Sequence, residues 1–236
     1  MKISLTFAKV LSWIVTIIVP VVLTLLAVRI VMSPWYVELE YRTPFFPEDQ
    51  YGFTREERLK YSKIAIAYLL NDADISFLGD LRFPEGQQAP DFSCQFMDDC
   101  TKFYNERELG HMLDVKIVVQ EALKVLYAGV VILALLGAWA WFGKWWGIYL
   151  NGLRRGGWLT VILLGAIILF VLVAFGLIFV FFHEIFFASG TWTFYYSDSL
   201  IRMFPERFWR DTFLMVGGIA GGLGVALGLG LKKKKV

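Results

Sequence analysis

The sequence predicts a mainly α-helical membrane protein: a four-helix transmembrane bundle with a small extracytoplasmic α+β domain between its first two spans. Three observations predict this fold. Of the 236 residues, 57% are hydrophobic, and the mean hydropathy of +0.57 exceeds that of an average soluble domain. Four apolar runs approach or exceed the roughly 20 residues of helix that cross a bilayer. One polar stretch, residues 37–110, is long enough to form a small domain outside the membrane.

The first span is predicted over residues 5–32, within an N-terminal segment of residues 1–36. Lys9 and Arg29 lie near opposite ends of this run, where long basic side chains can extend to the membrane interface. Pro20 lies inside the run, and a membrane helix tolerates such a proline. The run is longer than the apolar part of a signal peptide, and no small-residue cleavage site follows it, so we expect it to be retained.

The polar segment predicts both strands and helices. Alternation of apolar and charged residues over 37–41 predicts a strand, and a short strand or hairpin is predicted over 75–83. Between them, Thr54 and Glu57 have the spacing of a capping box, in which each side chain binds the other residue's backbone N–H. We therefore expect a helix that begins after Thr54 and ends near Leu70.

The two cysteines, Cys94 and Cys100, both lie in the polar segment. In an extracytoplasmic loop this pair can close a small disulfide ring, and two free thiols are the alternative. No histidine lies beside them, which disfavours a zinc site. The formal net charge of +2 is close to neutral, so the overall charge does not indicate a particular class of binding partner. We expect no nucleic-acid partner.

Residues 111–236 are predicted to contain the other three spans. Asn105 and Glu108 form a second capping box, and the helix that follows places Glu108, His111 and Asp114 on one face. The predicted elements after it are a span over 117–142, a short connection over 143–157, a span over 158–182, an outer loop over 183–210, and a span over 211–231 followed by a basic tail.

The last span contains three pairs of glycines four residues apart, a spacing that lets helix backbones approach closely. The pairs are Gly217 with Gly221, Gly218 with Gly222, and Gly224 with Gly228. Two interpretations fit them: close packing inside one bundle, which we favour, and a dimer interface.

The basic residues predict the orientation. The connection over 143–157 contains lysine and arginine but no acidic residue, and the chain ends in a run of four lysines before its last residue. The positive-inside rule places this connection and both termini in the cytoplasm. His111 and His183, the only two histidines, then lie on the same outer surface at about the same depth.

Several chemistries remain open for these histidines. The chain has no Gly-x-Ser-x-Gly elbow and no phosphate-binding loop, and the segment after His183 lacks the second histidine of a zinc protease. The pair could perform acid–base chemistry, share a metal, ligate haem, or serve as ordinary interfacial side chains. Asp114 and Glu184 are the nearest acidic residues and could orient a histidine ring.

A longer pattern includes both histidines. It consists of His111-Met112-x-Asp114-Val115-Lys116, Phe182-His183-x-x-Phe186, Trp192, and Asp198-x-Leu200-Ile201-x-x-Phe204-Pro205-x-x-Phe208-Trp209. This pattern resembles a bacterial integral membrane family, formerly a domain of unknown function, whose characterised members are lipoprotein intramolecular transacylases. The resemblance covers most of the chain, including the four-span plan.

The resemblance implies an acyltransferase of the bacterial cell membrane. Its substrate is a lipoprotein whose N-terminal cysteine carries a diacylglyceryl group, and the sn-2 acyl chain moves to the α-amino group of the same cysteine. His111 and His183 are implied as catalytic base and acid, with Asp114 as an orienting partner. The residues implied to contact substrate are Trp192, Asp198 and Trp209, and a structural role in shaping the outer loop is the alternative for them. Membrane lipids are expected partners, and neither a metal nor another cofactor is expected.

Two other functions remain as alternatives. The chain could be a non-catalytic accessory or scaffold subunit of a larger membrane complex, because its nine tryptophans and glycine-rich last span suit packing against partner helices. It could also be a membrane protein that binds haem or a metal through both histidines.

Overall fold

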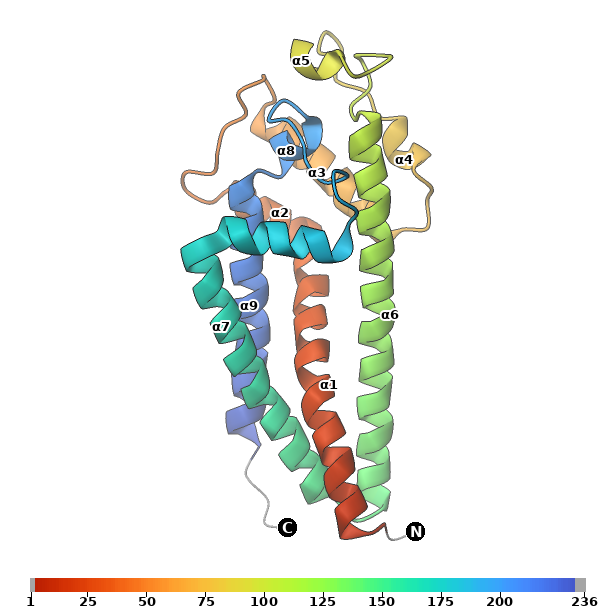
Figure 1. Ribbon diagram of the computed structural model, residues 1–236, viewed down its shortest axis with the longest axis vertical. Helices are drawn as coiled ribbons and strands as arrows, with labels where there is room; N and C mark the ends of the chain where they lie inside the picture. The colour runs from red at the N-terminus through yellow and green to blue at the C-terminus, as the bar shows by residue number, and fades with distance from the viewer. Residues whose placement is uncertain (1–2, 232–236) are drawn as a thin grey trace. The chain divides into compact units, whose positions relative to one another are not determined.

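A computed structural model describes residues 3–231, and Figure 1 shows the helices that they form. The described residues form nine helices, listed here in chain order: α1 (Leu5–Val31), α2 (Pro34–Tyr41), α3 (Arg55–Leu70), α4 (Ser76–Gly79), α5 (Asp91–Cys94), α6 (Glu106–Phe142), α7 (Trp146–Phe186), α8 (Ser199–Met203) and α9 (Glu206–Gly230). Over residues 3–231 there is no strand, only an isolated bridge between Arg82 and Lys102. The protein is mainly α, and the prediction of an α+β outer domain is wrong.

The predicted strand at 37–41 is part of α2. Pro34 occupies the first turn of this helix, where its fixed φ angle is favourable and no N–H is needed. Burial follows a helical stripe rather than alternation: Tyr36, Val37, Glu40 and Tyr41 are buried, whereas Leu39 is 44% exposed. Val37 and Tyr41 are four residues apart and so share one side of a helix as well as one face of a strand, which explains the error.

The predicted strand or hairpin at 75–83 is also absent, because the chain forms the short helix α4 there.

Both capping boxes are confirmed. The Glu57 N–H donates to Thr54 Oγ1 (3.1 Å) and the Thr54 N–H donates to Glu57 Oε2 (2.8 Å) before α3. Before α6, the Asn105 N–H donates to Glu108 Oε2 (2.9 Å) and the Glu108 N–H donates to Asn105 Oδ1 (3.0 Å).

In the part of the chain that the structure describes, four helices are long and apolar enough to cross a membrane: α1, α6, α7 and α9. They correspond to the four predicted spans, but α7 begins at Trp146 and not at residue 158. The segment 146–157, predicted as part of a connection, is therefore helical. A break in α7 occurs at Ala174, whose φ and ψ of −144° and 49° are not helical. The predicted tail of four lysines lies outside the described residues.

The chain divides into two compact units. Within the described residues, unit 1 contains residues 3–31, 122–173 and 213–231, and unit 2 contains residues 32–121 and 174–212. In unit 1, α7 packs closely on α1, because a Cβ at Gly152 would lie 2.7 Å from the Ser12 carbonyl oxygen and one at Gly156 would lie 2.5 Å from Val19 Cβ. These glycines have the small-xxx-small spacing of closely packed membrane helices.

A second close contact in unit 1 joins α7 to α9. A Cβ at Gly224 would lie 2.7 Å from the Gly157 carbonyl oxygen, and one at Gly228 would lie 2.7 Å from the Trp158 ring. For this pair of glycines, close packing inside one bundle is confirmed. Gly218 and Gly222 have no atom of the described residues within 4 Å of an added Cβ.

Unit 2 has an aromatic core. Phe103 stacks with Tyr61 at 4.0 Å and with Phe53 at 5.5 Å between ring centroids. Arg202 Cζ lies 3.7 Å from the centroid of Phe53, and its guanidinium donates two hydrogen bonds to the buried Asp49 carboxylate (3.0 and 2.9 Å). The ion pair is bidentate, which is the favourable geometry for a buried arginine. A disulfide joins Cys94 to Cys100 at the end of α5, as the first of the two sequence interpretations expected.

Candidate functional site

The two histidines are neighbours in unit 2. His111 lies in the second turn of α6 and His183 in the last turn of α7, 72 positions further along the chain. Their ring centroids are 6.0 Å apart and the ring planes differ by 21°. His111 is buried and His183 is partly buried. The prediction that the two rings lie close together is confirmed by this distance.

The hydrogen bonding of His183 decides which of its nitrogens is free. Nδ1 lies 2.7 Å from the Phe179 carbonyl oxygen, one turn earlier in α7. A carbonyl oxygen only accepts hydrogen bonds, so Nδ1 carries the proton and Nε2 keeps its lone pair. His111 Nδ1 is buried without a hydrogen-bond partner in the described residues. The pair therefore presents one imidazole fixed in orientation and one with an unsatisfied ring nitrogen.

Aromatic rings surround the two imidazoles. Phe187 lies 4.9 Å from His111 and 5.5 Å from His183, so it contacts both. Phe194 lies 5.2 Å from His111, and Trp192 lies 4.9 Å from His183. Trp192 was predicted as a site residue, but Phe187 and Phe194 were not. In the sequence these two phenylalanines are marked only by their position in aromatic-rich segments, and many other residues of this chain lie in such segments.

Trp192 Nε1 is a second unsatisfied polar atom at the site. It is buried and, within residues 3–231, no hydrogen-bond acceptor reaches it. An indole N–H is a donor only, and a buried donor without a partner is costly. Trp192 Nε1–H and His111 Nδ1 are thus two polar groups whose hydrogen-bonding capacity is unused beside the His183 ring.

The segment 192–198 is anchored by Asp198, which is buried. Arg107 donates to Asp198 Oδ2 (2.7 Å), as does the Tyr195 N–H (2.9 Å). Oδ1 accepts from Ser93 Oγ (3.0 Å) and Asn105 Nδ2 (3.2 Å). Four donors converge on this one carboxylate, which ties the segment to α5 and to the start of α6.

Arg107 extends this anchor to the aromatic rings. Its guanidinium carbon lies 4.7 Å from the Tyr195 centroid and 5.6 Å from the Phe194 centroid. Because Phe194 packs on His111, the Arg107–Asp198 ion pair is connected to the histidine pair through one side chain. Arg107 was not singled out in the sequence, where it is one of several charges in a capping segment.

The other two predicted site residues lie apart from the imidazoles. Asp114 is one turn beyond His111 in α6, but its carboxylate forms no hydrogen bond with the Nδ1 atom of either histidine. His183 Nδ1 is bonded to the Phe179 carbonyl oxygen, and His111 Nδ1 has no hydrogen-bond partner in the described residues. Trp209 contacts Phe204 and Phe208 at centroid distances of 6.0 and 5.6 Å, on α9 and the residues before it.

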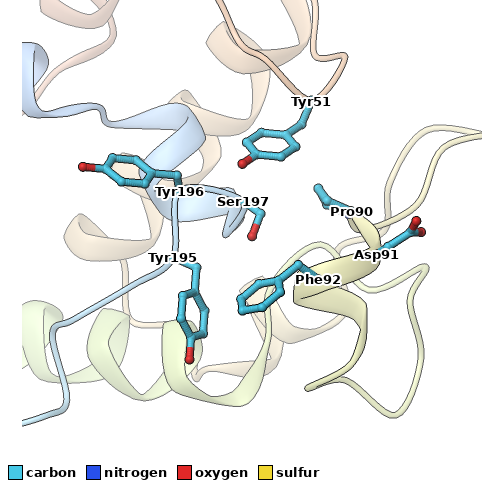
Figure 2. Close-up of a pocket in the computed structure, with 7 residues that line it drawn as sticks. All are labelled: Tyr51, Pro90, Asp91, Phe92, Tyr195, Tyr196 and Ser197. Carbon is cyan, nitrogen blue, oxygen red and sulfur yellow. The ribbon is translucent and has the colours of Figure 1, made fainter.

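An open pocket lies in unit 2 beside the anchored segment, with a volume of about 600 Å³ (Figure 2). It is lined by Tyr51, Pro90, Asp91, Phe92, Tyr195, Tyr196 and Ser197. Phe92 and Tyr195 form an edge-to-face pair at 4.7 Å on its wall. Tyr195 lines this pocket, while Phe194, the preceding residue, packs on His111, so the pocket and the histidine site share one segment of chain.

Within residues 3–231, no group of three or more His, Cys, Asp or Glu side chains is arranged to hold a metal ion. What the site does hold is a pair of imidazoles, one with a defined free nitrogen, beside an unused indole N–H. Such an arrangement can accept a proton, return it to a second atom, and hydrogen-bond a developing oxyanion.

Comparison with known proteins identifies relatives of this chain. The family model described as lipoprotein intramolecular transacylase Lit matches residues 10–209. A protein of Aquifex aeolicus (strain VF5), described as uncharacterized, is 30% identical over 212 residues, which is 88% of this chain and 87% of that protein.

Solved structures show the same fold. An in meso structure of the membrane integral lipoprotein intramolecular transacylase Lit from Bacillus cereus has a TM-score of 0.68 at 18% identity, and the match covers 94% of this chain and 93% of that chain. A structure of that protein with one histidine replaced by alanine has a TM-score of 0.65 at 19% identity, over 94% of this chain and 90% of that chain.

Proposed function

The chain belongs to the lipoprotein intramolecular transacylase Lit family, and we propose that it transfers the sn-2 acyl chain of a diacylglyceryl-modified lipoprotein cysteine to the α-amino group of that cysteine. The observation that carries this proposal is the His111–His183 pair, with ring centroids 6.0 Å apart. The substrate supplies both the ester and the amine, so the protein needs proton transfer and alignment rather than a nucleophile of its own.

Proton balance gives each histidine a role. The substrate enters with an α-ammonium group, and amide formation removes two protons from nitrogen while the leaving glycerol oxygen gains one. We assign the first proton to His183 Nε2, the nitrogen left free by the Nδ1–Phe179 hydrogen bond, and this proton is released to water. After the amine attacks the ester carbonyl, the second proton passes to His111 and then to the leaving oxygen as the C–O bond breaks.

Trp192 has a different proposed role. The tetrahedral intermediate places negative charge on the former carbonyl oxygen, and a buried donor aimed at that oxygen stabilises it. Trp192 Nε1–H is buried, unpartnered and beside His183, which supports its assignment as this donor. We keep Asp114, one helical turn from His111, as a positioning residue of that histidine, as the sequence predicted.

We assign the pocket of Figure 2 to the polypeptide that follows the modified cysteine. Consecutive residues, Phe194 and Tyr195, line the histidine site and the pocket, which supports this assignment. Asp198 then acts by holding this segment, and Trp209 by shaping the chain that follows it.

The proposed topology follows the sequence prediction. Segment 37–110 and the loop 183–210 lie on the extracytoplasmic side of the bacterial cell membrane, and both termini lie in the cytoplasm. Segments 1–36 and 111–236 supply the spans. This places the histidine site at the face where lipidated substrates are exposed.

The test is expression of the full chain with a lipoprotein reporter in a bacterium that lacks its own N-acylation of lipoproteins. The transfer is intramolecular, so it leaves the mass of the N-terminal peptide unchanged. Tandem mass spectrometry must therefore detect the fragment that carries the acyl chain on nitrogen. We expect this fragment with the natural chain and with the control Glu184→Gln, whose side chain is exposed beside His183.

His111→Gln and His183→Gln should each lose the N-acyl fragment while the protein still accumulates in the membrane. A free α-amino group in the presence of the natural chain contradicts the proposed function. N-acylation that persists in both histidine variants contradicts the assignment of these two residues and favours another catalytic group.

A further inference from the structure

Unit 1 has charges of one sign only. Its described residues, 3–31, 122–173 and 213–231, include no aspartate and no glutamate. The same residues include several lysines and arginines, and Lys9 and Arg155 are separated by 146 positions in the chain yet line one cavity. A cation in an apolar helix bundle normally lies against an acidic side chain or in water. Unit 1 offers no acidic side chain for this purpose.

Arg155 is held by neutral groups. Its Nε donates to Thr16 Oγ1 (3.2 Å) and its Nη2 donates to Ser12 Oγ (2.9 Å), both on α1. Its guanidinium carbon lies 4.3 Å from the Trp13 ring centroid. These contacts fix the guanidinium in position, but hydroxyl groups and an indole ring do not neutralise its charge.

The α1 hydroxyls are themselves fixed. Ser12 Oγ donates to the Ile148 carbonyl (2.7 Å), and Thr16 Oγ1 lies within hydrogen-bonding distance of the Ser12 and Gly152 carbonyls (2.9 and 3.2 Å). Gly152 permits this arrangement, because an added Cβ would lie 2.8 Å from Ser12 Oγ. The close packing of α1 on α7 thus holds the Arg155 guanidinium in a fixed position before any ligand binds.

The cavity at this place has a volume of about 160 Å³. It is lined by Lys9, Ser12 and Trp13 of α1 and by Ile148, Asn151 and Arg155 of α7. Ligand pockets for whole small molecules measure about 300–1,000 Å³, so this cavity suits one small charged group. Two cations from two helices border it, so the cavity suits an anionic group.

We propose that this cavity binds the phosphate group of an anionic phospholipid between Lys9 and Arg155. Arginine donors match a phosphate in geometry, and a lysine adds a second point charge. The surroundings favour a lipid over free phosphate. Both helices are apolar enough to cross a membrane, and Trp13, whose ring covers Arg155, is 58% exposed and so presents indole surface to acyl chains. This site is separate from the proposed transacylation and does not depend on it.

The test uses the purified full-length chain in detergent. Native mass spectrometry measures the binding of phosphatidylglycerol and of phosphatidylcholine with the same acyl chains, and thermal unfolding measures the shift in Tm with each lipid and with inorganic phosphate. The variant is Arg155→Gln, and the matched control is Arg154→Gln, which removes the same charge at the adjacent position, outside the cavity lining.

We expect the natural chain and Arg154→Gln to bind one phosphatidylglycerol in preference to phosphatidylcholine, with a rise in Tm. Arg155→Gln should bind it about tenfold more weakly, as expected for loss of hydrogen bonds to a charged group. Arg155→Lys, which keeps the charge, should retain part of the preference. Lys9→Gln should weaken it as well and serves as the test if Arg155→Gln does not fold.

Three results would overturn the proposal. The first is equal binding of the two lipids by the natural chain, and the second is an equal loss in Arg154→Gln and Arg155→Gln. The third is a Tm shift with inorganic phosphate as large as that with phosphatidylglycerol, because the site would then be one for free phosphate and not for a lipid.

Discussion

At the scale of single residues, the indole N–H of Trp192 is the feature that separates a catalytic from a packing role. Trp192→Phe keeps an aromatic ring 4.9 Å from His183 but removes the unpartnered donor. We expect N-acylation to slow about 100-fold, the usual effect of removing an oxyanion donor, with little change in Tm. Rates of N-acyl fragment formation measure the effect, and Trp35→Phe, the same change on α2, is the control. A rate equal to that of the natural chain would leave Trp192 with a packing role only.

Glu40 gives a prediction on pH. Burial, and second the Asp211 carboxylate, raise the pKa of the Glu40 carboxyl from 4.5 to about 7, although Arg207 and Arg210 lower it. Between about pH 4.5 and about pH 7 the folded protein therefore binds more protons at this group than the unfolded chain does. Glu40 then makes the free energy of unfolding fall as pH rises through this range.

Glu40→Gln removes this titration and leaves a side chain of the same shape. We expect the variant to unfold at a higher temperature than the natural chain near pH 8, and the difference to vanish or reverse below about pH 4.5. Thermal unfolding of the full chain as a function of pH measures this, with the exposed Glu48→Gln as control. Parallel pH profiles for the two Gln variants would contradict the assignment to Glu40.

At the scale of elements, one carboxylate holds the segment between α7 and α8. Asp198 accepts four hydrogen bonds, and the segment that it anchors places Trp192 and Phe194 on the two histidines. Asp198→Asn removes the ion pair with Arg107 but keeps an acceptor for the Tyr195 N–H. We expect a loss of about 2 kcal/mol in the free energy of unfolding.

The same substitution should slow N-acylation about tenfold or more, because small displacements of positioning residues reduce catalysis strongly. Asp72→Asn, an exposed acidic residue of unit 2, is the control for the charge change. If Asp198→Asn lowers Tm but leaves the rate unchanged, Asp198 stabilises unit 2 without positioning the site.

At the scale of the whole molecule, the helix packing of unit 1 depends on glycines that face another backbone. A Cβ at Gly156 would lie 2.5 Å from Val19 Cβ, whereas none at Gly165, on the same helix, would meet an atom of the described residues within 4 Å. We expect Gly156→Ala to lower the free energy of unfolding by about 1–3 kcal/mol through overpacking. Gly165→Ala should raise it by up to about 1 kcal/mol, because alanine favours helix. Thermal unfolding gives the sign, and equal effects of both substitutions would contradict this account of the packing.

The sequence alone determined the features that depend on adjacent residues. Apolar runs long enough to cross a bilayer predicted the four long helices, and the capping boxes at Thr54 and Asn105 predicted where α3 and α6 begin. Motifs around His111 and His183 indicated the family. These signals are local, because hydrophobic length and helix caps involve residues within a few turns of one another.

Only the tertiary structure decided what depends on residues far apart in the chain. The alternation of residue types at 37–41 could not distinguish a strand from a helix. In the structure this segment is part of α2, and the side chains on one side of that helix are buried. The helical segment 146–157 packs through Gly152 and Gly156 against α1. The spacing of these glycines favours close packing, but only the structure identifies α1 as the partner helix. Phe187 and Phe194 contact His111 from far along the chain, and the Arg107–Asp198 pair joins residues 91 positions apart. Contacts between distant side chains depend on how helices pack, and a single sequence does not specify that packing by periodicity.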